Sequence, residues 1–330
     1  MKVLFIGGTG EISHSCVERC LELGQDVAVF NRGVSDQPLP QGASRITGDV
    51  RDNSAYRKLG EKHFDVICQF LAYDATTAQR DVEVFGGECG QYVFISSAAA
   101  YRKPPDRHVT TEDVPLANPF WAYGRAKAEM EALLMQAHHE GRLPVTVVRP
   151  SHTFRRKFPG GIMPGDDWAW RVLNDKPIVA QGDGTSLWTL TYSSDFAVPF
   201  VGLLGNPKAI GEAFHITRHM EAFSWNQIWA ELGRSLGKEA KVVHVAADTL
   251  VRYNPDWTGQ LFGDKIHSAV FDNSKVMSVA GPFKCKIGLA EGMRLAAEHV
   301  KKRLASYKGD AKLHALTDRI IADQLALGGA

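Results

Sequence analysis

Residues 2–13 have the sequence Lys-Val-Leu-Phe-Ile-Gly-Gly-Thr-Gly-Glu-Ile-Ser, which sets a strand, a glycine cluster and a helical pattern in that order. Residues 3–6 are all apolar and predict a buried strand. Gly7 and Gly8 permit a sharp turn, and Gly10 lets the backbone approach a phosphate with no Cβ in the way. The following helix would direct its N-terminal N–H groups at that phosphate. This layout is typical of a turn that binds a dinucleotide.

One position departs from the usual glycine series of such turns. The third position holds Ser13, where close packing of helix on strand favours glycine. We expect this serine to be tolerated as a packing variant. The phosphates are then expected over residues 7–12, with contacts from Gly7, Gly10, Glu11 and Ile12.

The composition narrows the classes of protein to be considered. The 330 residues include 38 basic and 37 acidic side chains, so the overall charge favours neither nucleic acid nor an anionic membrane as partner. Cys16 and Cys20 lie one helical turn apart without a matching Cys/His pair, which predicts buried apolar residues and no metal site. No apolar run approaches the length of a membrane span, and no signal peptide precedes the first strand. We expect a cytoplasmic protein.

The first half of the chain alternates strand and helix patterns. Apolar strand-like runs occur at residues 3–6, 27–30, 45–47, 66–70, 92–95 and 145–148. Helical patterns separate several of them, at 15–23, at 81–86 and from Asn118-Pro119 to about His138. The last begins with a good N-cap followed by proline. This alternation predicts an α/β fold, a Rossmann-type doubly wound parallel sheet with helices on both faces.

The character of the sequence changes after Pro150. Residues 155–165 form a basic loop rich in glycine and proline, and a mixture of helix and strand patterns follows. Helices are expected at 167–174, 194–204, 225–236, 289–307 and 311–327, and strands at 213–217 and 242–245. We expect a dinucleotide-binding domain at 1–154 that also receives about 185–205. Residues 155–330 would form a smaller, interleaved substrate lobe, with the substrate in the cleft between them.

Tyr123 and Lys127 are four residues apart on a predicted helix and therefore share one face. A neighbouring ammonium lowers the pKa of a phenol, which makes the tyrosine a usable acid or base near neutral pH. Such pairs also occur on ordinary helix surfaces. The position of this pair, after the fifth strand of a nucleotide-binding sheet, favours a functional role.

Ser96 and Ser97 close the predicted strand at 92–95. Carboxyl ends of parallel strands open onto the ligand crevice, so Ser97 could bond a substrate oxygen. The alternative is that both serines simply end the strand in a turn.

These segments occur in a characteristic order along the chain: Gly7-x-x-Gly10, Gly48-Asp49-Val50, Ser96-Ser97, Tyr123-x-x-x-Lys127, Arg149-Pro150, Gly182-Asp183-Gly184 and Asp195-Phe196-Ala197. The order resembles the short-chain dehydrogenase/reductase superfamily and, more narrowly, its extended branch, the NAD-dependent epimerase/dehydratase family. The resemblance covers roughly residues 1–235. Each segment is common by itself, whereas the ordered set is specific.

The resemblance implies a role for each matching residue. Tyr123 would be the catalytic acid/base, Lys127 would hold the nicotinamide ribose and lower the pKa of Tyr123, and Ser97 would complete the triad. The family's cofactor contacts map onto Asp49 and Val50 beside the adenine, Leu71 and Ala72 along the adenosine, and residues 150–153, including Pro150 and His152, beside the nicotinamide. The helix with Tyr123 commonly forms a dimer interface in this family, so a homodimer is expected.

Two departures from the family pattern bear on the reaction. Ala98 and Ala99 stand where dehydratases carry an Asp-Glu pair, which argues against a dehydratase. Trp188 stands where nucleotide-sugar enzymes carry an arginine for the diphosphate, and an indole makes no bidentate phosphate contact. The basic loop, including Arg155, could supply that charge or could simply be solvated. The substrate contacts expected from these considerations are Ser97, Tyr123, Thr153, Arg155 and Trp188.

The choice of cofactor depends on the end of the second strand. NAD-preferring sites usually place an acidic residue there for the ribose hydroxyls, whereas this chain has Asn31 and Arg32. Arg32 could pair with a 2′-phosphate, which slightly favours NADP over NAD. Alternatively, Arg32 stacks on the adenine, which suits either cofactor.

The expected protein is an NAD(P)-dependent oxidoreductase or epimerase acting on a secondary alcohol or ketone of a sugar, nucleotide sugar or similar polyol. One alternative is an NADPH-dependent carbonyl reductase of a non-sugar metabolite. Another is a catalytically silent relative that binds RNA, although the intact Ser97, Tyr123 and Lys127 count against it. The expected partner is a small sugar-like molecule, and neither nucleic acid nor a membrane is expected.

Overall fold

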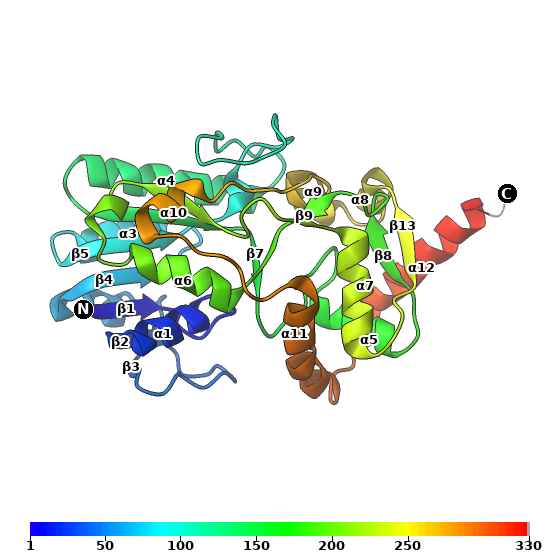
Figure 1. Ribbon diagram of the computed structural model, residues 1–330, viewed down its shortest axis with the longest axis horizontal. Helices are drawn as coiled ribbons and strands as arrows, with labels where there is room; N and C mark the ends of the chain where they lie inside the picture. The colour runs from blue at the N-terminus through cyan, green and yellow to red at the C-terminus, as the bar shows by residue number, and fades with distance from the viewer. Residues whose placement is uncertain (329–330) are drawn as a thin grey trace.

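A computed structural model describes residues 1–328 and has a seven-stranded parallel sheet at the centre of one part (Figure 1). The strand order is β11-β6-β5-β4-β1-β2-β3. The bounds are β1 (Lys2–Ile6), β2 (Asp26–Asn31), β3 (Ser44–Thr47), β4 (Phe64–Gln69), β5 (Cys89–Ile95), β6 (Val145–Pro150) and β11 (Ala213–Ile216). The interior strands are apolar runs because both faces of the sheet are covered. The expected Rossmann-type sheet is confirmed.

Helices cover both faces of this sheet. One face packs against α1 (Ser13–Glu22), α6 (Ser193–Leu203) and α10 (Ser274–Ala280). The other packs against α2 (Asn53–Arg57), α3 (Ala75–Phe85) and α4 (Ala122–His139). Helices on both faces leave the carboxyl ends of the strands open, and that edge carries the site.

The remaining elements build a second hydrophobic core. They include α5 (Gly165–Leu173), β8 (Ile178–Gln181), α7 (Trp225–Leu236), β13 (Val242–Val245), α8 (Ala247–Tyr253), α11 (Leu289–Leu304) and α12 (Ala311–Gly328). Four stacked or edge-packed tryptophans form its centre, with neighbouring ring centroids 5.3–5.6 Å apart: Trp168, Trp188, Trp225 and Trp229. Two of them lie on α7, which forms where expected because Ser224 and Gln227 make a capping box and Gly237 ends the helix in the left-handed conformation.

Short strands connect the two parts. β7 (His152–Phe154) pairs with β10 (Leu190–Tyr192), and β9 (Leu187–Trp188) pairs with β12 (Phe223–Ser224). The chain then returns to the large sheet through α6, β11 and α10 (Figure 1). We therefore propose that the cofactor-binding unit, residues 1–154, takes in these three elements and not β9.

Several expected helix boundaries are wrong, since the helix expected at 81–86 begins at Ala75 and the one expected at 289–307 ends at Leu304. The helix predicted from Asn118 begins at Ala122, because the Asn118 side chain caps a turn instead. Its Oδ1 accepts the N–H groups of Phe120 and Trp121 at 3.1 and 3.3 Å. Its Nδ2 donates to the carbonyls of Ala99 and Gly263, each at 2.7 Å. Asn118 thus ties the start of α4 to the two segments that flank the site.

Residues 1–328 contain no helix with the length and apolar character needed to cross a membrane. In the same range, no three His, Cys, Asp or Glu side chains gather as a metal ion would require. Cys16 and Cys20 are fully buried between α1 and the sheet, as expected for small apolar residues.

Candidate functional site

Each glycine of the turn after β1 is required for a different steric reason. Gly7 adopts a φ of +91°, which strains any other residue. A Cβ on Gly8 would lie 2.7 Å from the Val29 side chain, so this glycine allows α1 to approach β2. A Cβ on Gly10 would meet only the Ser13 hydroxyl, at 3.3 Å. Gly10 therefore leaves room for a ligand.

Ser13 is more than a packing variant. Its hydroxyl donates to the carbonyl of Gly7 at 2.6 Å and accepts the N–H of Gly10 at 3.0 Å. This single side chain bridges both ends of the turn and holds it in shape. A glycine at this position would pack equally closely but would lose both hydrogen bonds.

A cavity of about 690 Å³ opens beside the turn, at the carboxyl ends of β1, β2, β3 and β4. Its lining includes half of the expected cofactor contacts: Gly7, Gly10, Asn31, Arg32, Asp49, Val50 and Leu71. Nδ2 of Asn31 is buried without a partner among the described residues. An orphaned donor and the open side of Gly10 are what a dinucleotide would fill, so the residues present fit the cofactor.

The polar side chains that line this cavity beside β2 and β3 differ in their partners. Asp49 is paired with Arg51 at 2.7 Å, and hydrogen bonds from Arg51 hold the pKa of the Asp49 carboxyl well below its usual range. Oδ1 of Asn31 accepts the N–H of Gly33 at 3.0 Å. Arg32 lines the cavity and forms no ion pair within residues 1–328.

Lys127 on α4 is buried, with 3% of its surface exposed. Its ammonium donates to the carbonyls of Ala72 and Ile95, at 2.8 and 2.9 Å, and lies 5.8 Å from the ring centre of Tyr123. Burial lowers its pKa to about 8, while Glu131 acts in the opposite direction. Ala72 is one of the expected cofactor contacts. Its carbonyl accepts a hydrogen bond from Lys127, and it does not line the cofactor cavity.

Tyr123 lies one helical turn before Lys127 and belongs to the lining of neither cavity, but its ring centre is 5.2 Å from that of Trp121, which borders a second cavity. Burial raises the pKa of its phenol, and the Ser97 hydroxyl acts to lower it. Tyr73, in the cofactor cavity, and Asp264, in the second cavity, raise it further. The expectation that Lys127 lowers this pKa is not met, because the ammonium is directed at backbone carbonyls instead.

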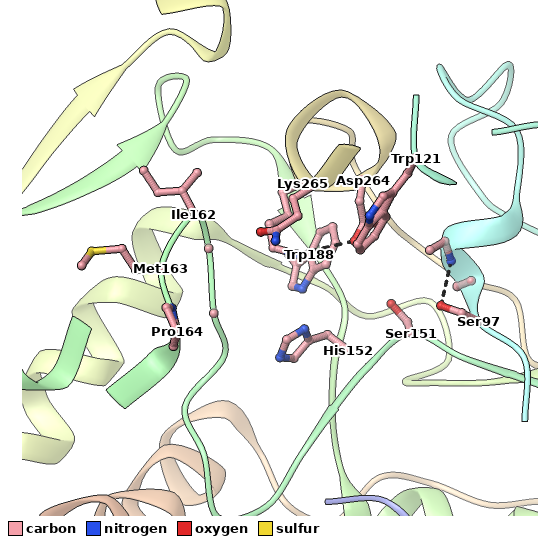
Figure 2. A pocket seen from close by; sticks show the side chains of 15 residues that line it. Ser97, Trp121, Ser151, His152, Ile162, Met163, Pro164, Trp188, Asp264 and Lys265 are labelled. Atoms are coloured by element: carbon pink, nitrogen blue, oxygen red, sulfur yellow. Dashed lines mark hydrogen bonds and ion pairs between the residues drawn. The ribbon is translucent and has the colours of Figure 1, made fainter. Parts of the chain in front are cut away.

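The second cavity has a volume of about 420 Å³ and lies next to Ser97 (Figure 2). Ser97 accepts the N–H of Ala99 at 3.1 Å and begins the 3₁₀ turn Ala98–Ala100, which forms one wall. The other walls come from the loop at 160–164 and from Trp121, Ser151, His152, Trp188, Gln260, Asp264 and Lys265. Burial and the nearby Lys265 ammonium lower the pKa of His152 to about 3, so its imidazole is neutral.

The expected substrate contacts fall in different places. Ser97 and Trp188 line the second cavity, and the Trp188 indole is 2% exposed. Thr153 lines an adjoining cavity of about 430 Å³, and Arg155 lines neither cavity. Asp264 and Lys265, which the sequence did not single out, lie on the turn Leu261–Lys265. The available signal was an Asp-Lys pair in a glycine-rich, mostly apolar segment.

Glu11 has partners other than a cofactor. Its carboxylate accepts the backbone N–H groups of Arg155, Arg156 and Lys157, at 3.1, 2.8 and 3.2 Å. We call this set of contacts the Glu11 latch. It joins the glycine turn to the basic loop, which continues directly into the 160–164 wall of the second cavity. Ile12 caps α1 and Pro150 ends β6 in the interior, and neither lines the cofactor cavity.

Comparisons with known proteins agree with this fold. The family model described as "NAD dependent epimerase/dehydratase family" matches residues 3–217. The chain is 25% identical to the 2'-dehydrokanamycin reductase of Streptomyces kanamyceticus over 253 residues, which are 75% of this chain and 70% of that one. It is 27% identical to the chloroplast stem-loop binding protein of 41 kDa b of Arabidopsis thaliana over 231 residues, 66% of this chain and 58% of that one.

Solved structures share the whole architecture at low identity. The epimerase Mth375 of Methanothermobacter thermautotrophicus has a TM-score of 0.76 at 15% identity, covering 92% of this chain and 93% of that one. The UDP-glucose 4-epimerase of Thermus thermophilus, solved in complex with NAD, has a TM-score of 0.71 at 20% identity. That match covers 91% of this chain and 99% of that one. At these identities the likeness establishes the fold.

Proposed function

The chain belongs to the NAD-dependent epimerase/dehydratase family, and from that premise we propose that it interconverts a secondary alcohol and a ketone on a sugar-like substrate. The observation that carries the proposal is the place of Tyr123. Its ring centre lies 5.2 Å from that of Trp121 in the second cavity and 5.8 Å from the Lys127 ammonium, which is itself 5.3 Å from the ring centre of Tyr73 in the cofactor cavity. A proton donor at that junction lies where a cofactor ring and a substrate carbon would meet.

The proposed chemistry assigns one task to each side chain. A bound reduced nicotinamide supplies hydride to a carbonyl carbon. Tyr123, whose raised pKa keeps the phenol protonated near neutral pH, gives its proton to the carbonyl oxygen. Ser97 bonds that oxygen and fixes its direction, and Lys127 holds the ribose side of the cofactor cavity.

Other features support a reductase or epimerase over a dehydratase. Ala98 and Ala99 form the cavity wall at the position of the dehydratase carboxylates. The proposed residues therefore include no Asp-Glu pair at this wall to remove and deliver the protons of water elimination.

We further propose NADP(H) as the preferred cofactor. Asn31 carries no charge that would repel a 2′-phosphate, and Arg32 lines the same cavity without an ion pair to neutralise it among the described residues. Structural neighbours have been solved in complex with NAD, so NADPH and NADH are to be compared directly.

The test of the catalytic assignment is Tyr123→Phe. Removing the hydroxyl should reduce turnover of ketosugars with NADPH by about 100-fold or more, because the general acid is lost. Calorimetric binding of NADPH should stay within a few-fold. Tyr253→Phe is the matched control, since Tyr253 bonds Asp323 of α12, lines neither the cofactor cavity nor the second cavity, and should keep full activity. Near-normal turnover by Tyr123→Phe would refute the assignment.

A second candidate function rests on the plant relative, whose name states that it binds a stem-loop. The same fold could bind RNA without turning over a carbonyl compound. Wild type and Tyr123→Phe would then bind a stem-loop RNA equally in a filter assay, with no NAD(P)H consumed on any alcohol or ketone. The near-zero net charge of +1 speaks against this candidate.

A further inference from the structure

A buried ammonium points into the second cavity. Lys265 is 7% exposed, and its Nζ lies 3.6 Å from the Asp264 carboxylate, longer than a hydrogen bond. The same Nζ lies 5.3 Å from the ring centre of Trp188 and 5.9 Å from that of Trp121. Figure 2 shows Lys265 and Asp264 together at one side of the cavity, with Trp188 and His152 next to them.

The positive charge at this place is only partly compensated. Lys103, which is 8% exposed, also interacts with Asp264, so one carboxylate serves two ammonium groups. The two histidines nearby do not change the balance, because burial lowers the pKa of both His152 and His267 and keeps them neutral. A charge that is buried without a full partner is costly, and a ligand of opposite sign removes that cost.

Besides the Asp264 carboxylate and the Gln260 amide, the cavity lining offers donors near Lys265. The Trp188 indole N–H is buried without a partner among residues 1–328. The Ser151 hydroxyl lines the same cavity. An indole N–H, a hydroxyl and an ammonium together match the oxygens of an anion better than the hydroxyls of a neutral sugar.

We propose that the substrate carries an anionic group, a carboxylate or a phosphate, which Lys265 and Trp188 bind inside the cavity that Ser97 borders. The proposal rests on the proposed function for the identity of this cavity as the substrate site. Binding of the anion itself needs no turnover. Lys265 then sets the specificity for the substrate. Because the cavity is small, the anionic group belongs to the same sugar as the reacting carbon.

The test is calorimetric titration of the full chain with four probes: D-glucuronate, D-glucose 6-phosphate, D-glucose and D-glucosamine. At least one of the two anionic probes should bind about tenfold or more tightly than D-glucose and D-glucosamine. The anionic probe that binds more tightly identifies the group as a carboxylate or a phosphate. Lys265→Met should weaken that probe by about 30-fold and change the neutral sugar little, because one partner of a buried ion contact is removed. Trp188→Phe keeps a ring but loses the N–H, and should weaken it several-fold.

Lys238→Met is the matched control, since Lys238 pairs with Asp175 at the surface and should bind every probe as wild type does. Equal binding of charged and neutral probes, or an unchanged affinity in a folded Lys265→Met, would overturn the proposal. Tyr123→Phe should retain anion binding. Lys265-dependent binding in a protein that reduces no ketone would refute the proposed function alone, whereas turnover without an anion preference would refute this inference alone.

Discussion

At the scale of single residues, Lys127 is the most constrained group of the site. Its ammonium is buried, and its two hydrogen-bond partners are neutral carbonyls. Neither carbonyl compensates the ammonium for its lost hydration as an anion would, so the pKa of Lys127 falls to about 8. The charge that would hold a cofactor ribose is therefore lost only slightly above neutral pH.

This pKa makes activity sensitive to pH. As pH rises through about 8, Lys127 loses its proton, and kcat/KM should decline with that apparent pKa. Lys127→Arg should move the decline upward, since a guanidinium stays protonated. A pH profile from 6 to 10 for both proteins is the measurement, and a wild-type profile that stays flat through pH 9 would contradict the role of Lys127.

Stability should change in the opposite direction over the same range. The folded pKa of Lys127 lies below the unfolded value of 10.5, so the unfolded chain binds more protons between about pH 8 and 10.5. The contribution of this group to the free energy of unfolding therefore becomes more favourable as pH rises there. Melting curves at each pH thus separate loss of activity from loss of fold.

Single residues also show what the sequence could predict. The glycine turn was placed correctly because each glycine answers a local steric demand. The bridging role of Ser13 depends on where its hydroxyl points once the turn has formed. The position of Lys265 in the cavity depends on how residues 260–265 fold beside Ser97. Neither arrangement has a local signature in the sequence.

At the scale of secondary-structure elements, the Glu11 latch joins parts of the chain that are about 145 residues apart. Three consecutive N–H groups form a concave donor site, which the carboxylate fills. Arg303 of α11 reinforces the same loop, donating to the Arg156 carbonyl at 2.9 Å and pairing with Asp166 at 2.8 Å. The wall of the second cavity is thus fixed from the cofactor side.

Glu11→Gln should loosen this loop. A neutral amide accepts the three hydrogen bonds less strongly, so trypsin should cut after Arg155, Arg156 or Lys157 several-fold faster than in wild type. Mass spectrometry of short digests would identify the cut. Glu22→Gln, an exposed position on α1 that pairs with Arg19, is the control and should leave the rate unchanged. Equal rates in all three proteins would show that the latch does not hold the loop.

The elements also show where sequence reasoning fails. α7 was predicted to the residue because its capping box and its terminal glycine are local signals. The start of α4 was wrong because Asn118 and Pro119 look like a helix start, while tertiary bonds to Ala99 and Gly263 use the Asn118 side chain elsewhere. The sequence does not predict β8 and β10, because each is short and pairs with a strand that is distant in the sequence.

At the scale of the whole molecule, cofactor binding should be visible as thermal stabilisation. A ligand at 100 times its Kd adds about 2.7 kcal/mol to the free energy of unfolding. For a chain of this size that corresponds to a rise in Tm of several degrees. At equal concentrations NADPH should raise Tm more than NADH, and Arg32→Ala should reduce the difference by weakening NADPH. A larger shift with NADH would contradict the proposed preference.

The overall architecture was the most predictable level. Six of the seven strands follow from apolar runs in the first half of the chain, whereas the strand expected at 213–217 in the second lobe joins the large sheet as β11, beside β6. The lining of the second cavity was the least predictable, because it gathers residues from six separate segments between positions 97 and 265. The proposed reaction could therefore be argued from motifs, whereas the proposed anionic group of the substrate could be argued only from the structure.

The distribution of tryptophan has an optical consequence. All seven tryptophans lie at position 121 or later, and five belong to the second core, whereas the cores on both faces of the large sheet contain none. Intrinsic fluorescence therefore reports on the second core and is nearly blind to the large sheet. The emission of Trp121 and Trp188 also overlaps the absorption of a reduced nicotinamide. The protein thus carries a built-in energy-transfer donor beside the place where its cofactor would react.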